Sequence, residues 1–288
     1  MTSSQNPTME EIREAIRKGR ERVASKTTYK IPEEAFRRCM TCNAPVEMFV
    51  KLFSDQDELV PCMCECDKEV QQQEIAAEQL QDRLIRIQRN RDEGITDGKY
   101  AKYTFDVDRD QKSEASRISR KYVENFAEMA ANNVGLLYSG NVGTGKTFYA
   151  CCIGNALLDK GYRVGITTLA DAISRIFSAK DKAGELRRIQ SFDLLIIDDF
   201  GTERDSEYAR EQIFSIIDAR SRAGKPTIFT TNLSRQFLES AKQLQDQRVF
   251  DRVLEMAPVT VVLNGQNRRD EEKQIKVQKA VSALLGDG

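Results

Sequence analysis

One loop, GNVGTGKT at residues 140–147, constrains the fold of this chain more than any other stretch of its sequence. Its three glycines let the backbone curl closely around a polyphosphate. The backbone N–H groups of such a loop, and the N-terminus of the helix that follows, point at the anion. The apolar run VGLLYS precedes the loop and predicts a buried strand. A strand, this loop and a helix in that order predict a nucleotide-binding site.

The residues of the loop have predictable tasks. We expect Lys146 to reach the β- and γ-phosphates of the nucleotide and the hydroxyl of Thr147 to bind Mg²⁺. Nine consecutive residues are predicted to contact the nucleotide: Gly140, Asn141, Val142, Gly143, Thr144, Gly145, Lys146, Thr147 and Phe148.

Two further strand ends carry polar residues. LLIIDDFG places Asp198 and Asp199 at the end of a buried strand. The first carboxylate is predicted to hold the Mg²⁺ shell, and the second to orient or activate a water against the γ-phosphate. A capped strand end is the simpler alternative, but paired carboxylates without a nearby cation are costly unless a metal is present. The run FTTN ends in Asn232, whose amide could position the attacking water.

Five apolar runs define the fold class: residues 134–140, 163–168, 192–198, 226–232 and 259–264. Most are apolar throughout, as strands buried on both faces should be. Helical stretches separate the first four, which predicts an α/β fold with a five-stranded parallel sheet flanked by crossover helices. Cys151 and Cys152 fall in a predicted buried helix and are expected to be core residues.

The N-terminal part is rich in cysteine. Five of the seven cysteines lie in two short motifs, CMTC with Cys39 and Cys42, and CMCEC with Cys62, Cys64 and Cys66. Thiolates at this spacing can close around one tetrahedral Zn²⁺ with a second pair about twenty residues on. The intervening APVEMFVKLFSDQDELVP predicts a small hairpin with its turn at SDQD. We predict Zn²⁺ held by Cys39, Cys42 and two of the three later cysteines; free thiols in a loose segment are the alternative.

The domain plan follows from these segments. We expect a helix (residues 9–25) and the cysteine-rich zinc module within 1–67, a helical linker at 68–99, the α/β domain at 100–270 and a charged tail at 271–288. The linker carries an apolar stripe at Ile75, Leu80, Leu84 and Ile87. A solvated helix and a partner-binding helix both fit this stripe.

Composition excludes several classes of protein. The chain has 44 basic and 45 acidic residues, so any contact with nucleic acid needs a local basic patch. It has no histidine, which excludes histidine-based acid–base chemistry. It shows no apolar run long enough to cross a bilayer and no secretory signal at its N-terminus, so no membrane contact and a cytoplasmic location are expected.

The order of the loop, the double-acid strand end and the polar strand end resembles AAA+ ATPases. The stretches YVENFAEMAANNVGLLYSGNVGTGKT, LLIIDDFGTERDSEYAREQIFSIIDAR, GKPTIFTTNLS and RVFDRVLE resemble the DnaC/DnaI-type bacterial helicase loaders, including phage versions, over residues 100–270. The cysteine-rich segment resembles that of Gram-positive-type members. The resemblance implies ATP binding, association with the hexameric replicative helicase through the N-terminal region, and its placement on single-stranded DNA.

The resemblance also implies head-to-tail self-association, in which an arginine of one subunit reaches the ATP of the next. RVFDRVLE supplies Arg248 and Arg252, of which position favours Arg252. A second arginine, called sensor 2, follows the last strand, where position favours Arg269 over Arg268. Most AAA+ enzymes carry Glu where this chain has Asp199, so we expect slow ATP hydrolysis that DNA or a partner stimulates.

Two other functions fit the motifs. One is a transposition-helper AAA+ ATPase of the insertion-sequence type, and the other is a non-hydrolysing adaptor that uses ATP as a structural ligand. The segment DAISRIFSAKDKAGELRRIQ is placed near DNA by the resemblance, with a solvated helix face as the alternative. Its candidate contacts are Arg175, Phe177, Lys180, Lys182, Arg187 and Arg188.

Overall fold

The computed structural model describes residues 37–51, 57–202, 206–241, 243–265 and 267, and the isolated positions 277, 278, 280 and 282. The expected helix at residues 9–25 lies outside the described residues. The chain divides into two compact units, residues 1–86 and 87–288. Among the helices of the described residues, none combines the length and apolar character needed to cross a bilayer.

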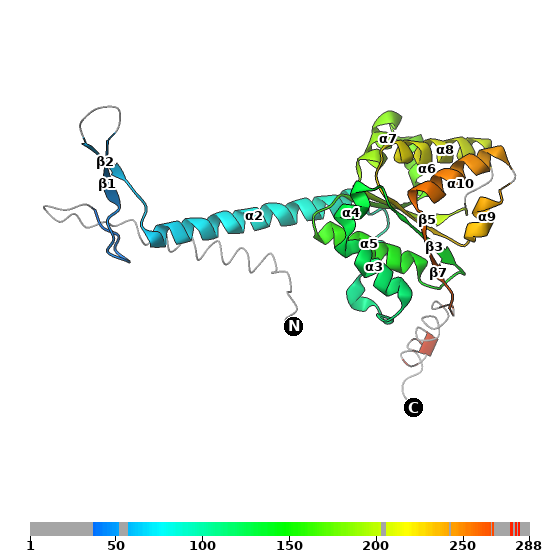
Figure 1. The fold of residues 1–288 in the computed structure, drawn as a ribbon, viewed down its shortest axis with the longest axis horizontal. Helices are drawn as coiled ribbons and strands as arrows, with labels where there is room; N and C mark the ends of the chain where they lie inside the picture. The colour runs from blue at the N-terminus through cyan, green and yellow to red at the C-terminus, as the bar shows by residue number, and fades with distance from the viewer. Residues whose placement is uncertain are drawn as a thin grey trace. The chain divides into compact units, whose positions relative to one another are not determined.

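The larger unit is built on five parallel strands (Figure 1). In chain order they are β3 (Leu136–Gly140), β4 (Val164–Thr168), β5 (Leu194–Phe200), β6 (Thr227–Thr231) and β7 (Val259–Leu263). Their order in the sheet is β4-β5-β6-β3-β7. The strands coincide with the five predicted apolar runs, which confirms the predicted α/β class. Since β3 lies beside β6, the loop that follows β3 opens next to the end of β6.

Helices cover both faces of this sheet (Figure 1). One face carries α3 (Glu114–Glu124), α4 (Phe126–Ala131) and α5 (Lys146–Asp159); the other carries α6 (Leu169–Ser178), α7 (Lys182–Ser191), α8 (Glu207–Arg222), α9 (Arg235–Glu239) and α10 (Leu244–Met256). Leu136 and Tyr138 of β3 join the first core and Leu137 joins the second, because strand side chains alternate. Cys151 and Cys152 are buried, as predicted.

Most helix starts in this unit follow from the sequence. Five of the helices begin after a side chain that accepts a backbone N–H of the first turn: Ser113, Thr168, Asp181, Ser206 and Ser234. Helix α5 differs, because the left-handed Gly145 precedes it and no side chain caps it. The first N–H groups of α5 are therefore left for another acceptor.

The smaller unit contains the predicted hairpin. Strand β1 (Glu47–Lys51) pairs antiparallel with β2 (Asp57–Pro61), and the connecting residues 52–56 lie outside the described residues. Helix α2 (Glu65–Gly94) follows the hairpin directly.

The last turns of α2, from Ile87 on, belong to the larger unit. There Arg91 donates to the Oδ1 atoms of Asn155 and Asp159 in α5 at 2.8 and 2.5 Å. Ile95 then forms a parallel bridge with Ile166 of β4. Two short 3₁₀ turns, η1 (Tyr100–Lys102) and η2 (Phe105–Val107), carry the chain from this edge to α3.

Candidate functional site

The glycine-rich loop lies where the sequence predicts it, between β3 and α5. Gly143 and Gly145 have φ angles of 80° and 100°, in the left-handed region that glycine adopts without a steric penalty. A Cβ on Gly143 would stand 1.6 Å from Oδ1 of Asn267, so a larger residue would have to displace that side chain. The loop thus brings an uncapped helix N-terminus and closely approachable backbone together, which is the geometry that binds phosphate.

Lys146 connects this loop to the neighbouring strand end. Its ammonium donates to the carbonyl oxygens of Gly140 and Asn141 at 2.9 and 2.8 Å, and to Oδ1 of Asn232 at 2.8 Å. The side chain is 5% exposed, although it lies at the carboxyl ends of the parallel strands. Lys146 and Asn232, 86 residues apart in sequence, therefore converge at one place.

Asp198 is the buried acid of the site. Its Oδ1 accepts from the hydroxyls of Thr147 at 2.7 Å and Thr230 at 2.6 Å, and its Oδ2 accepts from the hydroxyl of Tyr100 at 3.1 Å. No lysine or arginine of the described residues forms an ion pair with it. Hydroxyl donors leave the negative charge of a carboxylate uncompensated, and hard oxygen atoms are the ligands that Mg²⁺ prefers. The oxygens of Thr147 and Asp198 therefore fit a magnesium ion.

Tyr100 and Thr230 were not singled out by sequence reasoning. Burial, and then the nearby charge of Asp198, raise the pKa of Tyr100 well above its usual value, so its hydroxyl remains a donor. Thr230 both donates to Asp198 and accepts the backbone N–H of Asp199 at 3.0 Å. The motif FTTN contained a signal for Thr230, since it stands two positions before Asn232.

Asp199 is exposed, unlike its neighbour Asp198. The register between β5 and β6 shifts between Ile197 and Phe200, and Asp199 has a φ of 53°. A bulge of this kind redirects side chains at the end of a strand, and a left-handed non-glycine residue is a form of strain found at functional sites. The two acids therefore occupy different environments, as two different roles require.

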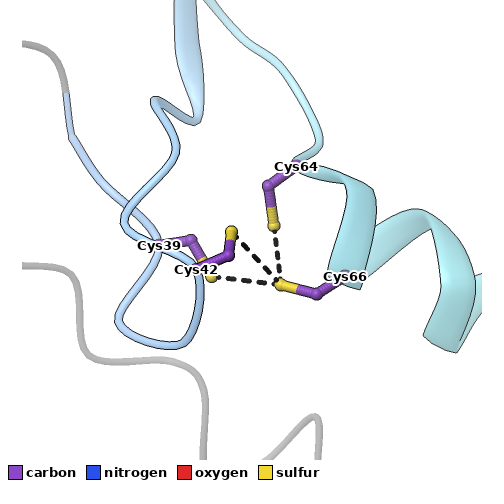
Figure 2. A group of neighbouring side chains, drawn as sticks. All are labelled: Cys39, Cys42, Cys64 and Cys66. Carbon is purple, nitrogen blue, oxygen red and sulfur yellow. Dashed lines mark hydrogen bonds between the residues drawn. The ribbon is translucent and has the colours of Figure 1, made fainter.

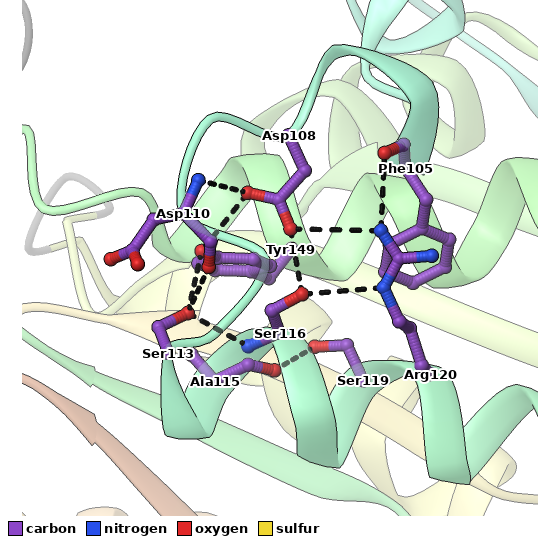
Figure 3. Close-up of polar contacts among 9 residues, drawn as sticks. All are labelled: Phe105, Asp108, Asp110, Ser113, Ala115, Ser116, Ser119, Arg120 and Tyr149. Carbon is purple, nitrogen blue, oxygen red and sulfur yellow. Dashed lines mark hydrogen bonds and ion pairs between the residues drawn. The ribbon is translucent and has the colours of Figure 1, made fainter.

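Phe148 follows the loop and lies beside the segment that precedes α3. Its ring meets Tyr103 edge-on, with centroids 5.7 Å apart. Figure 3 shows how this segment is held. The buried Asp108 accepts from Ser116 of α3 at 2.6 Å and from Tyr149 of α5 at 3.4 Å, and Arg120 stacks over Phe105. Residues 103–113 are thereby anchored along the helix that begins at the loop.

Of the two arginine roles that the sequence predicts, the structure describes the candidate residue for the role in trans but not the one for sensor 2. Arg252 forms an ion pair with Asp218 of α8, and its guanidinium lies 5.3 Å from the ring centroid of Phe214. This is a contact within the subunit, and the role in trans stays a prediction. Arg248 is exposed and forms no ion pair with any described residue. Arg268 and Arg269 lie outside the described residues, although Asn267, next to them in sequence, contacts Gly143 of the loop.

The smaller unit holds a cluster of four thiols: Cys39, Cys42, Cys64 and Cys66 (Figure 2). Their sulfur atoms all lie within 4.8 Å of one another. In a tetrahedral site with Zn–S bonds of 2.3 Å the sulfurs stand about 3.8 Å apart, so this cluster has the size for zinc. Cys62 is not a member, because its Sγ lies 3.8 Å from the carbonyl oxygen of Pro45.

Local backbone geometry supports ligand character at Cys39. Burial raises the pKa of this thiol, but the backbone N–H groups of Cys42 and Thr41, with the neighbouring thiols, lower it to about 6. Asn43 has a left-handed φ of 57°, which turns the chain back directly after Cys42. A thiolate is the form that binds a metal.

The α6–α7 segment presents an aromatic pair at its surface. Phe177 is 68% exposed and meets Tyr208 of α8, itself 45% exposed, edge-on at 6.2 Å. The ammonium of Lys182 lies 5.8 Å from the centroid of Phe177. Three of the predicted cations are committed to acidic partners within the segment: Arg175, Arg187 and Arg188. Tyr208 was missed, because it comes from another helix.

Comparison with known proteins agrees with this geometry. The family described as IstB-like ATP binding protein matches residues 70–275. The replicative helicase loader DnaC of Escherichia coli (strain K12) is 33% identical over 156 residues, which cover 52% of this chain and 61% of that protein. The matched part thus spans about three fifths of the curated relative.

Solved structures give the same fold. The crystal structure of the DnaC helicase loader aligns with a TM-score of 0.50 at 28% identity, covering 58% of this chain and 100% of that one. The crystal structure of DnaI aligns with a TM-score of 0.51 at 20% identity, covering 62% of this chain and 99% of that one. The larger unit is thus an AAA+ fold, and the chain belongs to the family of IstB-like ATP-binding proteins.

Proposed function

We propose that this chain is an ATP-dependent loader that places a hexameric replicative helicase on single-stranded DNA. The observation that carries the proposal is a convergence of four side chains at the carboxyl ends of the strands: Lys146, Thr147, Asp198 and Asn232. The chain that carries them is 33% identical to a replicative helicase loader over 156 residues. Together these four side chains offer the groups that a nucleoside triphosphate and its metal require.

The residues of this edge divide the work of ATP hydrolysis. Lys146 would neutralise charge on the β- and γ-phosphates, and the oxygens of Thr147 and Asp198, which share a hydrogen bond in the structure, would hold the Mg²⁺. Bound Mg²⁺ supplies positive charge to the phosphate oxygens. Asp199, exposed at the bulge, orients the attacking water, and the amide of Asn232 supports it. A carboxylate one methylene shorter than Glu stands farther from that water, which favours slow turnover.

The four-thiol cluster is proposed to hold one structural Zn²⁺. The support is the mutual closeness of the sulfurs of Cys39, Cys42, Cys64 and Cys66 in a part of the chain whose apolar core is small. Small modules of this kind depend on their metal for folding. Elemental analysis should find about one zinc per chain. Cys62→Ser should keep the zinc and Cys64→Ser should lose it; equal zinc content in the two variants would contradict the assignment.

Single-stranded DNA is proposed to stack on the aromatic pair of Phe177 and Tyr208. Exposed aromatic rings beside lysines are the usual platform for single strands, since every base offers a π-face. Lys180 and Lys182 are exposed, and neither forms an ion pair with any described residue, so both remain available for phosphate. The net charge of the chain is −1, which makes this local arrangement the source of affinity.

Two further contacts are proposed, one with the helicase and one between copies of this chain. The N-terminal unit is proposed to contact the helicase. The AAA+ unit is proposed to self-associate, with Arg252 leaving Asp218 to reach the ATP of its neighbour. Asp218 also pairs with Arg222 at 2.8 Å, so its charge would keep a partner.

Co-purification tests the proposal. A hexameric replicative helicase should be retained by the full chain, and a Cys64→Ser variant should lose the helicase but still bind ATP. Retention of no helicase, together with double-stranded DNA binding, would favour a transposition helper, which the family description also admits. Helicase binding with no hydrolysis under any condition would favour an adaptor that uses ATP as a structural ligand.

A further inference from the structure

Tyr100 stands out among the buried groups that the mechanism above does not use. It follows α2 in sequence, yet its hydroxyl reaches Oδ2 of Asp198, 98 residues further on, across 3.1 Å. The side chain is 1% exposed. Thr147 and Thr230 both donate to the other oxygen, Oδ1, so among the described side chains Tyr100 is the one that donates to Oδ2.

The backbone of Tyr100 is tied to the end of α2. Arg91, in the last turn of that helix, donates to Oδ1 of Asn155 at 2.8 Å. The amide of Asn155, which is buried in α5, donates in turn to the carbonyl oxygen of Tyr100 at 2.8 Å. A continuous series of hydrogen bonds therefore runs from α2 through Asn155 and Tyr100 to Asp198.

The neighbouring chain is fixed as well. Thr96 donates to the carbonyl oxygen of Ile166 through its N–H at 3.3 Å and its hydroxyl at 3.0 Å. A Cβ on Gly94 would stand 1.9 Å from the carbonyl oxygen of Val164, so the end of α2 lies directly against β4. The end of α2 and the segment that leads to Tyr100 are therefore both held against β4.

We propose that Tyr100 is a positioning residue that orients the metal-binding carboxylate of Asp198 and makes its orientation depend on the position of the end of α2. The inference rests on the proposed nucleotide site. With both carboxylate oxygens held, Asp198 cannot rotate about its terminal torsion, so Oδ1 stays directed at Thr147. Partners of this kind, one step removed from a metal, commonly change metal affinity 10- to 100-fold when removed.

The test is a Mg²⁺ titration of nucleotide binding with a fluorescent ATP analogue, on the full chain and on Tyr100→Phe. The substitution removes one hydroxyl and keeps the ring. We expect the Mg²⁺ concentration at half-maximal effect to rise about tenfold, while affinity for the analogue in EDTA is unchanged. Tyr122→Phe is the matched control. That side chain is 4% exposed, and its hydroxyl donates to the carbonyl oxygen of Val134, away from the site.

A second variant tests the connection to α2. Arg91→Met leaves the Tyr100 hydroxyl in place and should raise the Mg²⁺ midpoint in the same direction, by less than about tenfold because it acts through Asn155. The double variant should match Tyr100→Phe alone, because residues acting in one series are not additive. Thermal unfolding in EDTA identifies any variant that is not folded at the assay temperature, and Arg91→Met then carries the test.

The outcomes separate the two proposals. A folded Tyr100→Phe protein with the Mg²⁺ midpoint of the unmodified chain would overturn the positioning role and leave the nucleotide site standing. Additive effects of Arg91→Met and Tyr100→Phe would overturn the connection to α2. An unmodified chain that binds the analogue with no dependence on Mg²⁺ would overturn both this inference and the proposed site.

Discussion

Arg220 of α8 is the largest fully buried side chain among the described residues, and replacing it tests how the sheet is joined to its helices. Its Nε donates to Thr227 at 3.1 Å, and its terminal nitrogens donate to four backbone carbonyl oxygens at 2.7–3.4 Å: those of Ile189, Gln190, Phe192 and Pro226. Burial lowers the pKa of Arg220 to about 10, so it remains charged at neutral pH.

Arg220→Met keeps much of the volume and removes every donor. Four backbone carbonyls then lose a donor, although that of Pro226 keeps the N–H of Leu195, and each carbonyl left buried without a partner costs about 1–3 kcal/mol before relaxation. Methionine carries no charge, so the variant also avoids the free-energy cost of burying the guanidinium, and this offsets part of the lost stability. We expect a net loss of about 3–5 kcal/mol, the range seen when one partner of a buried charged cluster is removed. For a unit of this size that lowers the midpoint of thermal unfolding by roughly 10 °C.

Far-UV circular dichroism during heating measures this midpoint. Arg222→Met is the matched control, because Arg222 is two positions further along α8, is 71% exposed and forms an ion pair with Asp218 at 2.8 Å. It should change stability by less than about 0.5 kcal/mol. A midpoint for Arg220→Met within about 2 °C of the unmodified chain would refute the reasoning, since it would mean that the buried hydrogen bonds contribute nothing net.

Three further predictions concern the site. Lys146→Ala and Arg252→Ala should each abolish ATP hydrolysis. Mixing the two variants should restore part of the activity, because some interfaces then pair an intact loop with an intact arginine. No recovery in assemblies shown to be mixed would contradict the role of Arg252 in trans. Asp199→Asn should keep ATP binding and lower hydrolysis by about a hundredfold, and normal turnover would remove it from the water-orienting role. Phe177→Ala should weaken single-stranded DNA binding by about 1–3 kcal/mol, measured by fluorescence anisotropy against the exposed aromatic control Phe237→Ala; equal affinities would leave a solvated helix face.

Much of the architecture could be predicted because strand burial is visible in sequence. Five mainly apolar runs indicated five buried strands, and the carboxyl ends of parallel strands meet at one edge. That is why Thr147, Asp198 and Asn232 could be expected to converge, and why the structure brings them together.

The choice among the later cysteines could not be predicted, because Cys62, Cys64 and Cys66 are equally spaced. In the structure, local backbone contacts keep Cys62 out of the four-thiol cluster and bring Cys64 and Cys66 into it. The N–H of Cys62 still pairs with the hairpin, donating to the carbonyl oxygen of Val46 at 2.7 Å, whereas the first turn of α2 returns Cys66 to the cluster.

Contacts between distant segments were also beyond sequence reasoning. Tyr100 reaches Asp198 only because the chain after α2 runs along β4, a register that no local pattern specifies. The ion pair of Arg252 depends on how α10 packs on α8, and the left-handed Asp199 depends on a bulge that pairing with β6 creates. Each of these is a tertiary effect imposed on residues whose local sequence allows other conformations.

Loading of a hexameric helicase onto closed circular single-stranded DNA tests the central claim most directly, since a circle offers no end for the ring to thread. The unmodified chain with ATP should increase the amount of helicase that remains on the circle after gel filtration, and Lys146→Ala should not. The account would be contradicted if the circle retained the same amount of helicase with the unmodified chain, with Lys146→Ala and with no added chain, because loading would then not depend on this ATP site.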